Sequence, residues 1–104
     1  MKQIAFAIAL GMAVVAQASA ADMSALAKQK NCLACHSVDQ QMVGPAYKDV
    51  AAKFAGNTKA VTILSNAILH GSSGVWGPMS MPPNVQVTPA QAKELAQWIL
   101  SLKK

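Results

Sequence analysis

Apolar residues recur at helical spacing in four stretches of the chain, and no stretch alternates between apolar and polar positions as a strand would. The last stretch shows the helical pattern most clearly. Its apolar face consists of Ala92, Leu95, Ala96, Ile99 and Leu102. Just before it, Thr88, Pro89 and Gln91 match a capping box, with threonine as the N-cap and proline at the first helical position. The pattern predicts a C-terminal helix that begins after Thr88.

Three shorter helices are predicted upstream. They cover residues 24–31, 47–55 and 58–70, and Gly56 and Gly71 follow the second and third of them. The inward face of the third is formed by Val61, Leu64, Ala67 and Ile68. The sequence therefore predicts an all-α domain of about four short helices.

The segment before the C-terminal helix, residues 71–87, has no predicted element. It contains three glycines and three prolines. Segments without regular structure that exceed about 12–15 residues are uncommon in compact domains and are usually functional. Four short helices also make a small core, and small domains often depend on a metal, a disulfide or a cofactor. We therefore expect a bound group at the centre of the fold.

Residues 1–20 have the pattern of a secretory signal peptide. Lys2 lies near the start, residues 4–16 form an uncharged apolar run, and residues 18–20 read Ala-Ser-Ala, a typical cleavage site. The apolar run is shorter than the roughly 20 residues that a membrane-spanning helix needs. We therefore expect cleavage after Ala20 and export of residues 21–104 as one domain, with no stable membrane insertion.

The charge of residues 21–104 is modestly positive. Eight lysines and four acidic residues give a formal charge of +4 (8 − 4), and the chain has no arginine. Because bidentate recognition of phosphates and bases usually relies on arginine, we expect no nucleic-acid partner. A positive surface would speed encounter with an acidic protein, although it would serve solubility equally well.

The strongest motif is C-x-x-C-H at Cys32, Cys35 and His36, the attachment signature of a c-type haem. Two thiols at this spacing can form thioethers with the two vinyl groups of the porphyrin, and the adjacent imidazole then faces the iron. A disulfide or a thioredoxin-like site is an alternative, but that redox fold needs a strand–helix setting. A zinc site would need four ligands, and the only further histidine is His70.

The second axial ligand decides whether such a haem carries electrons or keeps an open site that binds gas or catalyses. The available donors are Met23, Met42, Met79, Met81 and His70. Two prolines follow Met81 and restrict the backbone there, which suits a ligand that must be held in place. Without a haem motif, methionines in this segment would be gap-filling residues, and His70 fits the C-terminus of a helix. We expect Met81 to be the ligand.

Four segments together resemble a small bacterial class I cytochrome c of the c-551/c-552 type, namely residues 31–36, 42–46, 71–78 and 81–84. Their order and spacing match that family over nearly all of residues 21–104. The resemblance implies the class I cytochrome c fold, with the helices packed around one covalently attached haem.

The resemblance also implies a ligand set. Cys32 and Cys35 would form the two thioethers of one haem c, and the iron would lie between His36 as proximal ligand and Met81 as distal ligand. The carbonyl of Pro45 would accept the imidazole N–H, which would fix the orientation of the ring.

Two further residues gain roles from the resemblance. Trp76 would donate its indole N–H to a haem propionate, and Asn84 would support the methionine sulfur. Each has a plainer interpretation, because Trp76 can be a packing residue, Asn84 can shape the loop and Pro45 can simply end a turn. Trp98 is assigned to packing between the first and last helices.

The sequence departs from the family pattern at two places. Ser80 stands where relatives commonly have a proline, and Met79 precedes it, which loosens the arm and leaves Met79 as an alternative candidate to Met81. Ala67 lies about where relatives often place a basic side chain near the propionates. The pH dependence of the potential therefore cannot be transferred from the family.

The function that the resemblance implies is one-electron transfer in the periplasm, in a respiratory chain and without enzymatic activity. A membrane-bound quinol-oxidising complex would be the donor, and a nitrite reductase, a terminal oxidase or a peroxidase the acceptor. We expect a monomer. A haem sensor or enzyme with an open distal site is the alternative from another class. A thiol–disulfide oxidoreductase is a third, which requires two free thiols in the reduced protein.

Overall fold

The structure is a computed structural model that describes residues 21–102. Its helical elements are α1 (Ser24–Gln29), the short 3-10 helix η1 (Cys32–Ala34), α2 (Tyr47–Lys53), α3 (Ala60–His70) and α4 (Pro89–Ser101). The described part holds no strand beyond one isolated antiparallel bridge between Ser72 and Met81. The predicted all-α fold is confirmed. The expected signal peptide at residues 1–20 and the last two lysines lie outside the described residues.

Helix α4 begins as its sequence predicts. The Thr88 hydroxyl accepts a hydrogen bond from the backbone N–H of Gln91, and the Gln91 side chain accepts one from the backbone N–H of Thr88, both at 3.1 Å. These two bonds satisfy amides at the helix start that have no partner inside the helix. The buried face of the helix consists of Ala92, Leu95, Ala96, Trp98 and Ile99.

The first two helices are shorter than predicted. The first ends at Gln29 rather than at residue 31, because Asn31 adopts the left-handed conformation, with φ at 67°. Asparagine tolerates that conformation better than most residues, and the turn directs the chain into η1. The second ends at Lys53, two residues before the predicted end at residue 55. The third predicted helix ends at His70 as expected, and Gly71 after it has a positive φ.

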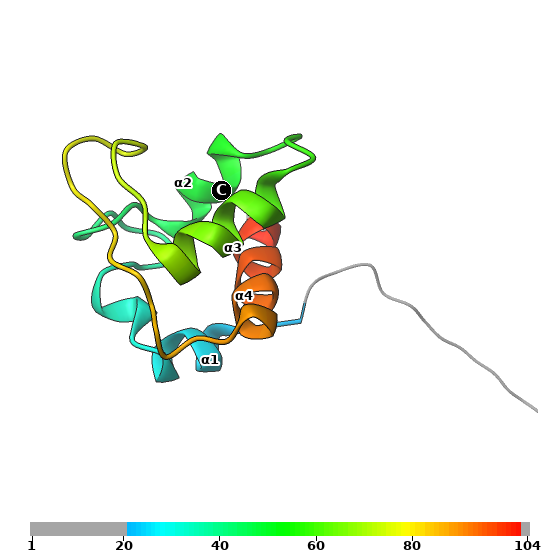
Figure 1. The fold of residues 1–104 in the computed structure, drawn as a ribbon. Coiled ribbons are helices and arrows are strands. Elements are labelled where there is room, and N and C mark those ends of the chain that lie inside the picture. Colours follow the sequence, from blue (N-terminus) through cyan, green and yellow to red (C-terminus); the bar gives the residue numbers. More distant parts are fainter. Residues whose placement is uncertain (1–20, 103–104) are drawn as a thin grey trace, which may run out of the picture.

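The core lies where α3 and α2 pack against α4. Side chains from these three helices are buried together, among them Tyr47, Val50, Leu64, Ile68, Leu95 and Ile99. Figure 1 shows α3 crossing α4, and the segment after α3, drawn yellow to orange, returning past α1 to the start of α4. Within residues 21–102, every helix is too short or too polar to cross a membrane.

Trp98 is a packing residue, with 5% of its surface exposed. Its ring meets that of Tyr47 edge-on, at a centroid distance of 5.6 Å. Its ring partner comes from α2, and Ala27 of α1 belongs to the same buried cluster. This pair connects the core to the residues that surround His36.

Candidate functional site

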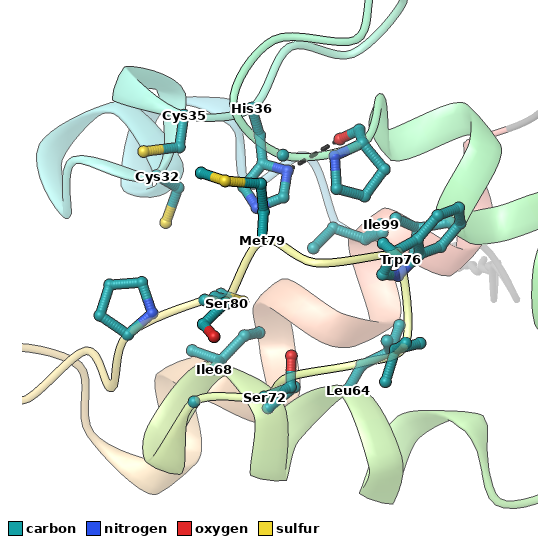
Figure 2. A pocket seen from close by; sticks show the side chains of 18 of the residues that line it. Cys32, Cys35, His36, Leu64, Ile68, Ser72, Trp76, Met79, Ser80 and Ile99 are labelled. Carbon is teal, nitrogen blue, oxygen red and sulfur yellow. Dashed lines mark hydrogen bonds between the residues drawn. The ribbon is translucent and has the colours of Figure 1, made fainter.

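A cavity of about 750 Å³ lies between the C-x-x-C-H segment and the long segment that follows α3. Its volume is within the roughly 300–1,000 Å³ that is typical of pockets for small molecules and cofactors. Leu64 and Ile68 of α3 and Ile99 of α4 form an apolar wall (Figure 2). Cys32, Cys35, His36, Pro45, Trp76, Met81 and Asn84, the residues named from the sequence, all line this cavity.

The two cysteines lie close to each other at the edge of this cavity. Cys32 is the first residue of η1 and Cys35 follows its last residue, so one tight turn carries both. Both are half-buried free thiols, and Figure 2 shows their sulfur atoms on the same side of that turn. Burial raises the pKa of the Cys32 thiol, and a hydrogen bond with the Tyr47 side chain partly offsets that effect.

The ring of His36 is already oriented. Its Nδ1 donates a hydrogen bond of 2.8 Å to the carbonyl oxygen of Pro45, drawn as the dashed line in Figure 2. A neutral imidazole that donates from Nδ1 carries its lone pair on Nε2. That nitrogen is the one that can bind a metal, and the hydrogen bond fixes both its tautomer and its direction.

Two further residues hold the same ring. A Cβ added at Gly44 would lie 2.8 Å from Nδ1 and 3.0 Å from Nε2 of His36, so the main chain of Gly44 lies directly against the imidazole. Tyr47 stacks against His36, with ring centroids 4.9 Å apart and an interplanar angle of 23°. We call Gly44, Pro45 and Tyr47 the proximal clamp.

Main-chain hydrogen bonds hold the clamp against the haem-attachment motif. The N–H of Gly44 donates to the carbonyl of Cys35 at 2.8 Å, and the N–H of Tyr47 donates to that of Ser37 at 2.9 Å. Tyr47 is 4% exposed, and this burial is the main cause of the raised pKa of its phenol. Gly44 and Tyr47 are not among the site residues predicted from the sequence. A glycine directly before the expected histidine partner Pro45 was a usable signal for a close approach of two segments.

The opposite wall of the cavity is formed by residues 71–84, which we call the distal arm. Met81 is held in it by its main chain, since its N–H and C=O both bond to Ser72, at 2.8 and 3.0 Å. Gly71 permits this approach, because a Cβ there would lie 2.6 Å from the Met81 carbonyl oxygen. The Met81 side chain is half-buried and packs against the core.

Asn84 attaches the distal arm to α3. Its backbone N–H and its side-chain Nδ2 both donate to the carbonyl of Ile68, at 3.0 and 2.9 Å. That carbonyl belongs to the last turn of α3, where helix carbonyls have no partner inside the helix. In this structure the Asn84 amide therefore binds the end of α3, and its support of the Met81 sulfur stays a prediction.

The outer part of the distal arm is exposed. Trp76 is 40% exposed, and the ammonium of Lys53 lies 5.2 Å from its ring centroid. Met79 is 59% exposed and lines the same cavity as Met81. Donation from Trp76 to a propionate stays a prediction. His70 also lines the cavity, although its side chain is exposed at the end of α3.

The residues present fit a covalently attached haem. Two thiols lie beside an imidazole whose Nε2 is available, and a large apolar cavity adjoins all three. The donors fit zinc poorly, since residues 21–102 contain no group of three or more His, Cys, Asp or Glu side chains that could hold a metal ion.

Known proteins resemble the chain over most of its length. The cytochrome c family model matches residues 20–103. Cytochrome c-551 from Pseudomonas aeruginosa is 52% identical over 96 residues, which cover 92% of this chain and 91% of that protein. Cytochrome c-552 from Nitrosomonas europaea is 59% identical over 78 residues, or 75% of this chain and 76% of that protein. The crystal structure of wild-type cytochrome c552 from that organism matches with a TM-score of 0.75 at 57% identity, and covers 77% of this chain and 99% of the other.

Proposed function

The chain belongs to the cytochrome c family, and from that premise we propose that it is a periplasmic one-electron carrier whose iron lies between His36 and Met81. Its class I cytochrome c fold and its covalently bound haem c, with iron, follow from the family and from the C-x-x-C-H motif. The observation that carries the ligand assignment is that one cavity brings together an oriented His36 and a Met81 whose main chain is fixed.

On the proximal side, Cys32 and Cys35 would hold the porphyrin through thioethers, and His36 would bind the iron through Nε2. The Pro45 carbonyl accepts a hydrogen bond from the Nδ1–H of the ring, which makes Nε2 a stronger donor to a metal. The stacked Tyr47 ring leaves the imidazole little freedom to rotate. The proximal ligand is therefore positioned by its surroundings before any redox change.

On the distal side, Met81 would occupy the second axial position of the iron. The bridge to Ser72 fixes its main chain, and the two bonds from Asn84 to α3 fix the arm beyond it. The haem supplies exchange of a single electron between ferrous and ferric iron. A thioether ligand and apolar surroundings favour the ferrous form and raise the potential. A site closed on both sides has no position for a substrate, so we propose a carrier rather than an enzyme.

The exposed edge of the cavity is where we propose that partners approach. Trp76 and Met79 are exposed there, and Lys53 lies beside the Trp76 ring. With a net charge of +4 (8 − 4) on residues 21–104, the surface would favour acidic partners and mainly raise the association rate. We propose a quinol-oxidising complex as donor and a nitrite reductase, an oxidase or a peroxidase as acceptor. The signal-peptide pattern supports the periplasm.

Binding of carbon monoxide tests whether the distal coordination position of the iron is occupied by a protein ligand. The reduced protein at neutral pH should bind the gas slowly and weakly, because Met81 must first leave the iron. Rapid, tight binding to the wild type would contradict the carrier and favour a sensor or an enzyme with an open site. A variant without either methionine of the arm, Met79→Leu with Met81→Leu, provides the control and should bind the gas rapidly.

A further inference from the structure

We propose that Met79 is a second thioether ligand for the distal position, which binds the haem iron when Met81 is not bound. The inference rests on the proposed His36 and Met81 ligation and extends it. It gives the distal arm two ligands of the same chemical class, separated only by Ser80.

The first support is the composition of the cavity wall. The described chain contains Met23, Met42, Met79 and Met81, and only the last two line the cavity. Met79 is 59% exposed, whereas Met81 is half-buried against the core. The two thioethers therefore reach one cavity from different depths, Met81 from within and Met79 from its rim.

The second support is the local geometry of the chain. Met79 and Ser80 are in neither a helix nor a turn, and Met81 forms the bridge with Ser72. One residue separates Met79 from Met81, and both line the same cavity. Figure 2 shows the Met79 side chain extending toward the wall that carries His36.

The third support is the difference in anchoring. The bridge holds the main chain of Met81, whereas Met79 lies in the loop that the bridge closes, after Gly74 and Gly77. Both glycines have positive φ, and a Cβ at either would have no neighbour within 4 Å, so this part of the arm has room to move. Methionine adds three rotatable side-chain bonds and a polarisable sulfur. Met79 can therefore follow the iron without displacing the bridge.

A second thioether has a functional consequence. When Met81 leaves the iron, an open coordination position would admit gases or other small ligands. Met79 would occupy that position with another neutral sulfur donor, so the site stays closed and its potential stays high. His70 is the competing nearby donor, but it would give nitrogen ligation and a lower potential.

The test compares four holoproteins: the wild type, Met79→Leu, Met81→Leu and the double variant. Leucine conserves side-chain volume but cannot bind iron. We expect the weak far-red methionine–iron band of the oxidised protein in all but the double variant. If Met79 occupies the iron in about nine of ten Met81→Leu molecules, imidazole should bind that variant about tenfold more weakly than the double variant.

Each other result overturns a distinct statement. A wild type without the band refutes the proposed His/Met ligation itself. A wild type with the band and a Met81→Leu variant without it, or one that binds imidazole as tightly as the double variant, refutes only the role of Met79. Loss of the band in Met79→Leu alone would make Met79 the primary ligand. If Met81→Leu does not accumulate, Met81→Ala provides the same comparison.

Discussion

The two walls of the cavity are built in different ways. The proximal clamp is local, since Gly44, Pro45 and Tyr47 lie within eleven residues of His36 and contact its ring directly. The distal arm is held by the bridge between Ser72 and Met81 and by the bonds from Asn84 to Ile68, which is 16 residues away in the sequence. These bonds fix only its inner end, and its outer part is exposed.

This difference indicates that the two walls have different roles in holding the ligands. A ligand that is half-buried, hydrogen-bonded on one side and packed on others, as His36 is, keeps the same geometry in both redox states, so it costs little reorganisation. An arm fixed only at its inner end can release and rebind its ligand, and the identity of that ligand depends on which donors the arm carries. In the proposed ligation, the proximal wall would therefore orient the haem, and the distal wall would determine whether the second axial position of the iron is occupied.

The largest effect should come from removing the two cysteines that would attach the haem between the two walls. Cys32→Ser combined with Cys35→Ser should give a largely unfolded protein, because the remaining helices form a small core. Far-ultraviolet circular dichroism measures the helix content. Ala34→Ser, which changes an exposed residue between the two cysteines, is the control and should stay folded. A stable, folded double variant would show that the core does not depend on haem.

Crowding the proximal clamp should have the next largest effect. In Gly44→Ala the new methyl group would meet the His36 ring, and such overpacking typically costs about 1–3 kcal/mol of stability. Denaturant unfolding measures that loss, and the hyperfine-shifted proton signals of His36 should move as well. Gly74→Ala is the control: its positive φ disfavours alanine, but no atom lies near the added group, so it should cost stability without moving the His36 signals. Unchanged His36 signals in Gly44→Ala would argue against the clamp.

Weakening the anchor of the distal arm should cost less. Asn84→Ala removes one of the two donors to the Ile68 carbonyl, and a net loss of about 1 kcal/mol is typical of one such hydrogen bond. The far-red methionine–iron band should weaken while the His36 signals stay in place. If the His36 signals moved as much as the band changed, the two walls would not be independent.

The smallest effect is expected in the scaffold behind both walls. The buried Oγ of Ser65 in α3 has no hydrogen-bond partner within residues 21–102. Ser65→Ala removes that unsatisfied group and adds a better helix former, so stability should rise by about 0.5 kcal/mol. Thermal unfolding of the holoprotein measures this change. A loss of stability would indicate that the hydroxyl has a partner after all.

Local signals in the sequence predicted the elements well. The capping box at Thr88 and Gln91 placed the start of α4 at the right residue, because a cap depends only on neighbours in the chain. The ends of α1 and α2 were less predictable. Asn31 leaves the helical conformation just before η1. Helix α2 ends at Lys53, three residues before Gly56, rather than at residue 55. The conformation of a single residue at a helix end is decided by the segments that pack around it.

Contacts between residues far apart in the chain could not be predicted from the sequence. The bridge between Ser72 and Met81 pairs two residues of a segment that had no predicted element. Gly44 has no positive φ, so only the space taken by His36 explains a glycine at this position. Asn84 was expected near the methionine sulfur, whereas its side-chain amide donates to the Ile68 carbonyl, a contact that depends on how α3 and the arm lie in space.

The most direct test of the account is the absorption spectrum of the exported wild-type protein, recorded oxidised and reduced. We expect sharp c-type bands in the reduced protein and the weak far-red methionine–iron band in the oxidised one, which together show a haem closed by histidine and methionine. A haem spectrum without the far-red band would contradict the closed distal wall and the carrier function that depends on it.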